Sequence, residues 1–206
     1  MELVELVHPA RTVVLTQECQ KGVIGDLSAL PALAESAHAT GLVDTINRLV
    51  TVGRAAGCRV VHCLAGTRAD RRGASTNAPL FAAAARSPVT LELGTEACEL
   101  VDGIDQDPGD VVSTRIAGLS PINGTEVPLV LRNLGATTVV IVGVSTNVAI
   151  PNATFDCVNA GFDVVIPRDA ITGYPVDYTD VLIRNTLGVV AKICTTEELV
   201  AEWTRP

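Results

Sequence analysis

The stretch TTVVIVGVSTNVAI, residues 137–150, decides the fold of this chain. It begins with an apolar run, passes through a turn that contains hydroxyl and amide side chains, and continues into a segment with apolar residues at helical spacing. Apolar runs without alternation are typical of strands buried on both faces of a parallel sheet. We therefore expect a central strand, a strand-to-helix turn and the first residues of a helix.

The same alternation of strand and helix runs along the chain and predicts a three-layer α/β domain with right-handed crossovers. The other predicted strands are RTVVLTQ (11–17), CRVVHCL (58–64), DVVSTR (110–115), DVVIP (163–167) and VVAKIC (189–194). Helices are predicted over 42–57, 125–135, 148–161 and 178–188, and TTEE (195–198) predicts the capped start of a last helix. No linker divides residues 1–206, so we expect a single domain.

Composition narrows the class of function. The 206 residues are 48% hydrophobic and carry 15 basic and 23 acidic side chains, a net charge of −8. This acidity disfavours nucleic-acid partners and binding to an anionic membrane surface. The first residues, MELVELVHPA, lack the basic and apolar regions of a signal peptide, and the apolar runs are too short to span a bilayer. We expect a cytoplasmic protein.

Metal and cofactor motifs are not found in the sequence. The six cysteines are scattered without a CxxC pair, and the three histidines have no metal-binding spacing. No GxGxxG follows the first strand and no Walker lysine motif occurs. The sequence therefore predicts neither a metal nor a cofactor.

Two long stretches, 20–41 and 65–79, follow strand carboxyl ends and read as irregular loops. Ligands of open α/β sheets bind on that side of the sheet, and long loops there are usually functional. We expect these loops to determine the substrate.

The turn at 143–147 partly matches the GxSxG motif of serine hydrolases, with Ser145 as the nucleophile. In that fold the catalytic histidine follows the serine, whereas every histidine here precedes Ser145. Asn147 also replaces the second glycine of the motif. A serine nucleophile is therefore disfavoured.

Polar groups follow three of the predicted strands: Glu18, Arg115 and the turn 143–149. The carboxyl ends of parallel strands meet at one edge of a sheet, so these groups can converge on one pocket. Spacing alone favours a structural ion pair between Glu18 and Arg115, or two unrelated surface charges, over a functional pocket.

Three ordered motifs resemble the isochorismatase-like (cysteine hydrolase) superfamily over nearly the whole chain. They are VVLTQECQKGVIG, RIAGLSPINGTEV with LRNLGATTVVIVGVSTNVAI, and FDCVNAGFDVVIPRDA. The resemblance implies a Rossmann-like αβα sandwich with a mainly parallel six-stranded sheet. It also implies a small-molecule substrate and a homodimer or homotetramer.

The family's amidases use an Asp, a Lys and a Cys, and the resemblance places these catalytic positions at Glu18, Arg115 and Ala149. All three residues differ, and a methyl group cannot attack a carbonyl. Glu18 keeps a carboxylate that can act as acid or base. Arg115 can bind an anion but cannot shuttle a proton.

The resemblance assigns substrate binding to the turn residues Val144, Ser145, Thr146 and Asn147. It predicts a cis peptide between Val144 and Ser145, with backbone N–H groups near Ala149 that stabilise an oxyanion or carboxylate. The family's isochorismatases cleave a vinyl ether by acid chemistry, and some of them lack the cysteine.

Three interpretations remain open from the sequence. The first is a cysteine-independent hydrolase of a small anionic metabolite, with Glu18 as acid/base and water as the attacking group. The second is a non-catalytic ligand-binding or assembly protein that keeps the fold. The third is an amidase that uses a displaced thiol, Cys157 or Cys19. Arg68, Arg71 and Arg72 belong to a pocket rim, a subunit contact or a solvated loop.

Overall fold

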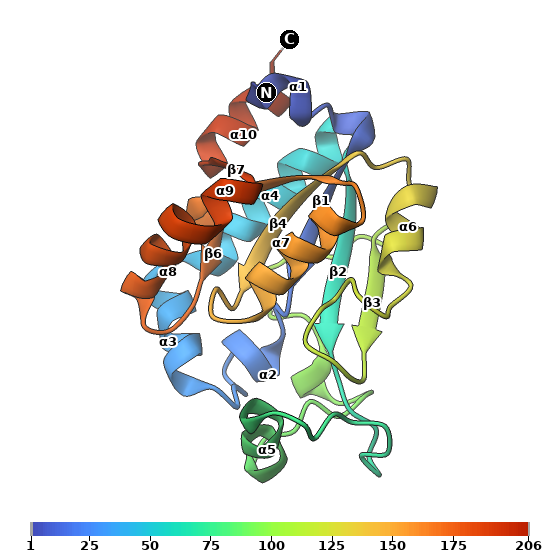
Figure 1. Ribbon diagram of the computed structural model, residues 1–206, viewed down its shortest axis with the longest axis vertical. Helices are drawn as coiled ribbons and strands as arrows, with labels where there is room; N and C mark the ends of the chain where they lie inside the picture. Colours follow the sequence, from blue (N-terminus) through green and yellow to red (C-terminus); the bar gives the residue numbers. More distant parts are fainter. Residues whose placement is uncertain (1, 206) are drawn as a thin grey trace.

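The computed structural model describes residues 2–205, which form a parallel sheet between two layers of helices (Figure 1). Six strands follow one another in the order β3-β2-β1-β4-β5-β7, and the two-residue β6 pairs with β4. Every strand pairing is parallel. The strands are β1 (Thr12–Gln17), β2 (Arg59–Ala65), β3 (Val111–Arg115), β4 (Thr138–Val144), β5 (Asp163–Pro167), β6 (Ile171–Thr172) and β7 (Lys192–Cys194).

The sheet confirms the fold class and all six predicted strands, with boundaries shifted by up to three residues. The central strands β1 and β4 are buried along their whole length. Their apolar runs fit this position, since each side chain enters one of two cores.

Two hydrophobic cores lie on opposite faces of the sheet. On one face, Val14 and Val140 pack with Leu49 of α4 (Leu42–Ala56). The other helices of that core are α1 (Leu3–Leu6), α2 (Lys21–Ile24), α3 (Pro31–Ala39) and α10 (Thr196–Trp203). On the other face, Leu15 and Ile141 pack against α6 (Val127–Asn133), α7 (Ala149–Asn159) and α8 (Val176–Leu182). This arrangement confirms the three layers.

Local signals explain several helix ends. The predicted capping box is present at α10, where the Glu198 N–H donates to Thr195 Oγ1 at 3.2 Å and the Thr195 N–H donates to Glu198 Oε2 at 2.7 Å. Helix α4 ends at Gly57, whose positive φ of 105° suits glycine. The helix predicted over 178–188 is interrupted: α8 is followed by a π-turn at Ile183–Leu187 and by α9 (Gly188–Val190).

The stretch 20–41 is more regular than we predicted. It contains α2 and α3, whose buried residues include Val23 and Leu33. Beyond the second stretch, α5 (Pro79–Arg86) has no buried residue. In Figure 1 α5 lies at one end of the molecule, beyond the carboxyl ends of β2 and β3. No helix within residues 2–205 is long and apolar enough to cross a membrane.

Candidate functional site

Glu18 lies immediately after β1, at the carboxyl edge of the sheet. Its N–H donates to the carbonyl of Cys63 at 2.9 Å, which continues the pairing of β1 with β2. Its φ of 51° is in the left-handed region that non-glycine residues rarely adopt. Backbone in such a conformation clusters at functional sites. The turn of the chain directs the carboxylate away from the strand, and the side chain is 17% exposed.

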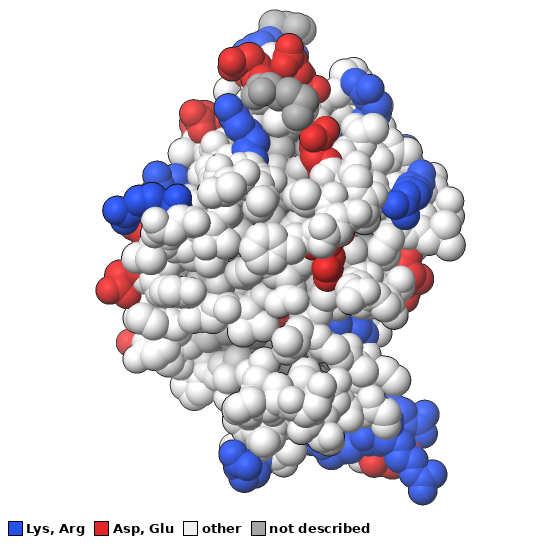
Figure 2. Space-filling model, in the orientation of Figure 1, with Lys and Arg blue, Asp and Glu red and all other residues white. Residues whose placement is uncertain are grey.

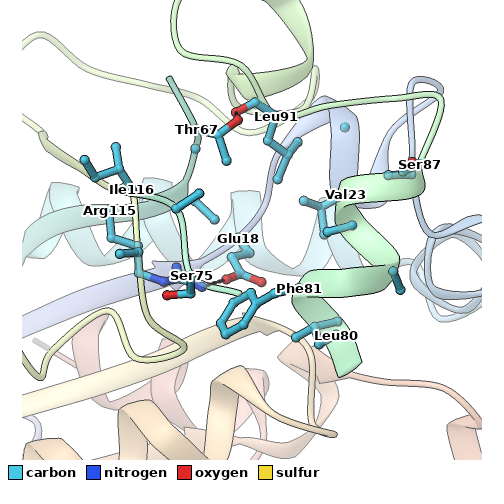
Figure 3. Close-up of a pocket in the computed structure, with 18 of the residues that line it drawn as sticks. Glu18, Val23, Thr67, Ser75, Leu80, Phe81, Ser87, Leu91, Arg115 and Ile116 are labelled. Atoms are coloured by element: carbon cyan, nitrogen blue, oxygen red, sulfur yellow. Dashed lines mark hydrogen bonds and ion pairs between the residues drawn. The ribbon is translucent and has the colours of Figure 1, made fainter. Parts of the chain in front are cut away.

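Arg115 is the last residue of β3 and its side chain is 10% exposed. Its Nη2 forms an ion pair and hydrogen bond with Glu18 Oε1, drawn as a dashed line in Figure 3. Its Nε donates to the Gly118 carbonyl at 3.3 Å. The buried Nη1 has no hydrogen-bond partner among residues 2–205. The guanidinium is therefore fixed at two nitrogens, Nε and Nη2, and its third nitrogen is left without an acceptor among the described residues.

Glu18 and Arg115 line a cavity of about 260 Å³. The rest of its wall is mostly apolar, and Figure 3 shows Phe81 and Leu80 of α5 on the side facing Glu18. Other apolar lining residues are Val23, Leu30, Leu91 and Ile116. The cavity thus combines one carboxylate and one guanidinium with apolar walls, as ligand sites commonly do.

The segment 65–79 forms part of the cavity wall. Ser75 Oγ accepts a hydrogen bond from the Gly118 N–H at 2.9 Å, which ties this segment to the residues after β3. Of the three predicted rim arginines, Arg71 lines the cavity. Arg68 instead pairs with Asp70, with 2.9 Å between Nε and Oδ1.

No residue of the turn at 143–149 lines the cavity that Glu18 and Arg115 line. The peptide between Val144 and Ser145 is cis, as the resemblance predicts. Val144 is buried at the end of β4, and Ser145 is partly exposed. Neither residue is among those that line the cavity.

Thr146 and Asn147 use their side chains to hold the segment after β6. The Thr146 hydroxyl lies 2.9 Å from the hydroxyl of Thr179, and the Asn147 amide exchanges two hydrogen bonds with the Tyr174 backbone, at 2.7 and 3.0 Å. Thr146 is buried and Asn147 is exposed. Both side chains stabilise the turn itself.

Ala149 is buried and begins α7. Its methyl group offers no nucleophile at this position. Its backbone N–H has no acceptor among residues 2–205, as is usual for the first residue of a helix. Ala149 does not line the cavity, so the structure groups Glu18 with Arg115 and leaves Ala149 outside their pocket wall.

Cys19 and Cys157, the two thiols considered as replacement nucleophiles, are buried. Burial raises the pKa of the Cys19 thiol to about 12, and the charge of Glu18 adds to this effect. Burial also raises the pKa of Cys157 to about 12. A thiol with such a pKa carries almost no thiolate at neutral pH, which disfavours Cys19 and Cys157 as nucleophiles.

Gln20 lies two residues after Glu18 and fixes the backbone geometry around it. Its Nε2 donates to the carbonyls of Ala65 at 2.8 Å and Cys98 at 3.1 Å, and its Oε1 accepts from the Ala65 N–H at 2.9 Å. This side chain joins the ends of β1 and β2 to the segment before β3. We therefore assign Gln20 a positioning role at this edge of the sheet.

Sequence reasoning missed two features near the site. One is the helix α5. Its sequence PLFAAAAR lacks the alternation of apolar and polar faces by which a helix packed on a core is predicted. The other is Gln17, a fully buried residue whose amide has no partner among the described residues. A glutamine that ends the otherwise apolar run RTVVLTQ was a visible signal. Within residues 2–205 no group of three or more His, Cys, Asp or Glu side chains is placed to hold a metal ion.

Comparisons with known proteins agree with this architecture. The model of the isochorismatase domain matches residues 12–198. A cysteine hydrolase from Pseudomonas syringae pv. phaseolicola has a TM-score of 0.82 and 21% identity, over 95% of this chain and 93% of that one. An isochorismatase family protein from Desulfovibrio vulgaris has a TM-score of 0.78 and 24% identity, over 95% of this chain and 100% of that one.

One curated relative matches a shorter part of the chain. A protein-glutamate methylesterase/protein-glutamine glutaminase from Nitrosospira multiformis is 32% identical over 107 residues. The match covers 52% of this chain and 29% of that protein, so the chain spans less than a third of this relative's length.

Proposed function

We propose that this chain, which belongs to the isochorismatase family, is a hydrolase of a small anionic metabolite that works without a cysteine nucleophile. The family model covers residues 12–198. The observation that carries the proposal is the pairing of Glu18 with Arg115 in a largely apolar cavity, in a chain that has Ala149 at the family's nucleophile position.

Glu18 is the proposed acid/base. Its carboxylate lines the cavity, where it can give a proton to a bound molecule or take one from it. The Arg115 guanidinium has only hydrogen-bond donors and cannot shuttle a proton, so its proposed role is to bind and orient the substrate. The buried Nη1 of Arg115 has no partner among residues 2–205, and because it carries two N–H groups it can donate to a substrate atom and to a second acceptor.

The surroundings of the cavity favour an anionic substrate. Residues 66–90 contain four arginines and one aspartate, in a chain whose net charge is −8. Figure 2 shows basic side chains at the end of the molecule where Figure 1 places α5, while the centre of this face is largely uncharged. A local excess of positive charge attracts anions to a neighbouring pocket.

The cavity volume favours a small substrate. Pockets for drug-sized ligands usually exceed about 300 Å³, and this one is about 260 Å³. A metabolite with one small ring or a short chain fits this volume.

Water is the proposed attacking group, because Ala149 cannot be one and the thiols of Cys19 and Cys157 are buried. In the vinyl-ether reaction, Glu18 gives its proton to the double-bond carbon and an oxocarbenium ion forms. A water oxygen then bonds to the cationic carbon and releases a proton to the Glu18 carboxylate. The hemiketal formed in this way then collapses: its hydroxyl group loses a proton, the ether oxygen gains one, and the C–O bond between them breaks to release a ketone, which is pyruvate for isochorismate, and an alcohol. One water is consumed and Glu18 returns to its starting state.

The turn 143–149 is proposed to complete the site by its backbone. The Ala149 N–H has no acceptor among residues 2–205 and is proposed as a donor to the carboxylate of the anionic substrate. Val144, Ser145, Thr146 and Asn147 hold that backbone in place through the bonds described above.

Two further expectations belong to the proposal. The protein is expected to form a homodimer or homotetramer, which light scattering can measure, and to be located in the cytoplasm.

The test is hydrolysis of a panel of small carboxylate-bearing compounds, with isochorismate for vinyl ethers and related esters and amides beside it. Products are followed by mass spectrometry, with and without prior treatment of the folded protein with iodoacetamide. We expect the protein to hydrolyse at least one compound of the panel, and we expect this turnover to persist after the protein has been alkylated. Loss of turnover on alkylation would show a thiol mechanism instead, and ligand-induced thermal stabilisation without any turnover would indicate a binding protein.

A further inference from the structure

Gln17 is the last residue of β1 and is completely buried. Both polar atoms of its side chain, Oε1 and Nε2, lack a hydrogen-bond partner among residues 2–205. Gln20, only three residues away and also completely buried, satisfies both of its amide atoms. Burial of an unpaired amide is unfavourable, so an unpaired glutamine in a core needs a specific explanation.

The strand geometry places Gln17 on the same face of the sheet as the Arg115 side chain. Gln17 continues the series Val13 and Leu15, which pack under α6 and α7, because side chains alternate along a strand. Gln17 pairs in register with Cys63, and Cys63 pairs with Ser113 of β3. Arg115 follows two residues after Ser113 and therefore shares that face.

Arg115 contributes a second unpaired group to this region. Its Nη1 is buried without a partner among the described residues, while Nη2 is paired with Glu18. Glu18 and Arg115 both influence the pKa of Cys63, which burial chiefly raises, so their charges lie close to the residue opposite Gln17. Two unused donors and one unused acceptor thus occur near the same end of β1 and β2.

The three unpaired atoms are two donors, Gln17 Nε2 and Arg115 Nη1, and one acceptor, Gln17 Oε1, and this combination indicates which kind of molecule they bind. A carboxylate would satisfy the two donors but would leave Gln17 Oε1 without a hydrogen. A water molecule both donates and accepts, and buried waters commonly take about three hydrogen bonds from otherwise unpaired polar groups. Water therefore fits Gln17 and Arg115 better than an anion does.

We infer that Gln17 is a positioning residue that, with Arg115 Nη1, binds the water used in hydrolysis. This inference rests on the proposed function. The water donates one hydrogen to Gln17 Oε1 and accepts from Gln17 Nε2 or Arg115 Nη1. Its second hydrogen is directed to the Glu18 carboxylate, which takes that proton as the water oxygen bonds to the substrate carbon.

Stability separates this inference from a merely structural role. The variant Gln17→Met has a side chain of similar size without polar atoms. If the amide were unpaired in a dry core, Gln17→Met would raise the melting temperature, because it removes an unfavourable burial. If a water satisfies the amide, the melting temperature stays equal or falls. The matched control Gln20→Met removes hydrogen bonds that the structure shows, and its melting temperature must fall.

Kinetics test the role of the water. With a substrate identified from the panel, Gln17→Met is expected to lower kcat about 100-fold, the effect typical of a misplaced reacting group, while KM changes less than about twofold. The pH profile keeps its shape, because Glu18 is unchanged. An unchanged kcat, or a raised KM alone, would overturn the positioning role.

A high-resolution crystal structure of the unmodified protein supplies the readout that is independent of activity. An ordered water bonded to the Gln17 amide and lost in Gln17→Met supports the inference. Continuous apolar packing around that amide, or a raised melting temperature in Gln17→Met, would overturn it even if the protein proves to be a hydrolase. A water at Gln17 in a protein that hydrolyses nothing in the panel would instead contradict the proposed function.

Discussion

Arg115 holds the Glu18 carboxylate in an ion pair that is nine-tenths buried on the arginine side. Removing one partner of a buried pair leaves the other charge without compensation. Arg115→Met is therefore expected to lower the free energy of unfolding by about 3 kcal/mol, measured by urea denaturation. Arg168→Met is the control, because its ion pair with Asp180 is mostly exposed and contributes little. Equal losses in the two variants would mean that the Glu18 pair is solvated.

A second buried charge network lies on the opposite face of the sheet. Arg54 binds the Asp110 carboxylate through Nη2 at 2.6 Å, and His62 Nε2 lies 3.3 Å from the same carboxylate. The Thr16 hydroxyl lies 2.8 Å from His62 Nδ1. Burial lowers the pKa of His62 below its usual value of 6.5, although the hydrogen bond to Asp110 opposes this shift.

This shift predicts acid sensitivity. Below pH 6.5 the unfolded chain binds a proton at His62 that the folded protein resists, so stability falls as the pH decreases toward the folded-state pKa. The slope from this one group is at most about 1.4 kcal/mol per pH unit. We expect His62→Gln to flatten the dependence of the melting temperature on pH in this range. An identical slope in the variant would show that other groups cause the acid sensitivity.

Asp110 acts at lower pH. Its burial works to raise its pKa, but the hydrogen bonds from Arg54 and from the Asp107 N–H outweigh this and hold the pKa below its usual 3.8. The stability that Asp110 contributes is present above pH 3.8 and is lost as the pH falls through the folded-state value. The effects of His62 and Asp110 on stability therefore begin at different pH values, and one series of stability measurements over pH distinguishes them.

All six cysteines are buried and free, so the folded protein should react slowly with thiol reagents. Burial raises the pKa of Cys58 and Cys194 to about 12, as it does for Cys19 and Cys157. We expect a chromogenic disulfide reagent to titrate few thiols in the native state and six after denaturation. Rapid modification of one thiol in the native protein would reopen the displaced-thiol mechanism.

Gly143 is required by the close approach of β1 to β4. Its φ is 111°, and an added Cβ would clash with the Gln17 carbonyl oxygen and lie 2.9 Å from the Gln17 nitrogen. Because both atoms are backbone, Gly143→Ala must displace a central strand, and we expect a loss of about 3 kcal/mol or more. Gly161→Ala is the control: its φ of 86° carries similar strain, but nothing lies within 4 Å of the added carbon. A comparable loss of stability in Gly161→Ala would mean that the positive φ alone, and not the contact with Gln17, causes the loss in Gly143→Ala.

The fold was largely predictable because strands buried on both faces leave continuous apolar runs. VVLTQ and TTVVIVGV read as strands for this reason, and the helix at 42–57 carries a clear apolar face. The helices α2 and α3 were missed because Gly, Ala and Ser dilute the helical pattern of 20–41. The two-residue β6 has no periodicity to detect.

The meeting of Glu18 with Arg115 followed from topology, since parallel strands end at one edge. The orientation of Thr146 and Asn147 did not follow, because it depends on how the segment at Tyr174 and Thr179 docks against the turn. The side chains that close the cavity, Leu80 and Phe81, come from a helix whose position no local pattern encodes. Long-range packing determines both features.

The most direct test of the central claim compares hydrolysis by the unmodified protein with hydrolysis by Glu18→Gln, which keeps the side-chain size and removes the titratable proton. Pyruvate release from isochorismate, or turnover of the compound found in the panel, is the readout. Glu35→Gln on the exposed face of α3 is the control. We predict a loss of about 100-fold or more for Glu18→Gln and no loss for Glu35→Gln. Full activity in Glu18→Gln would contradict the account.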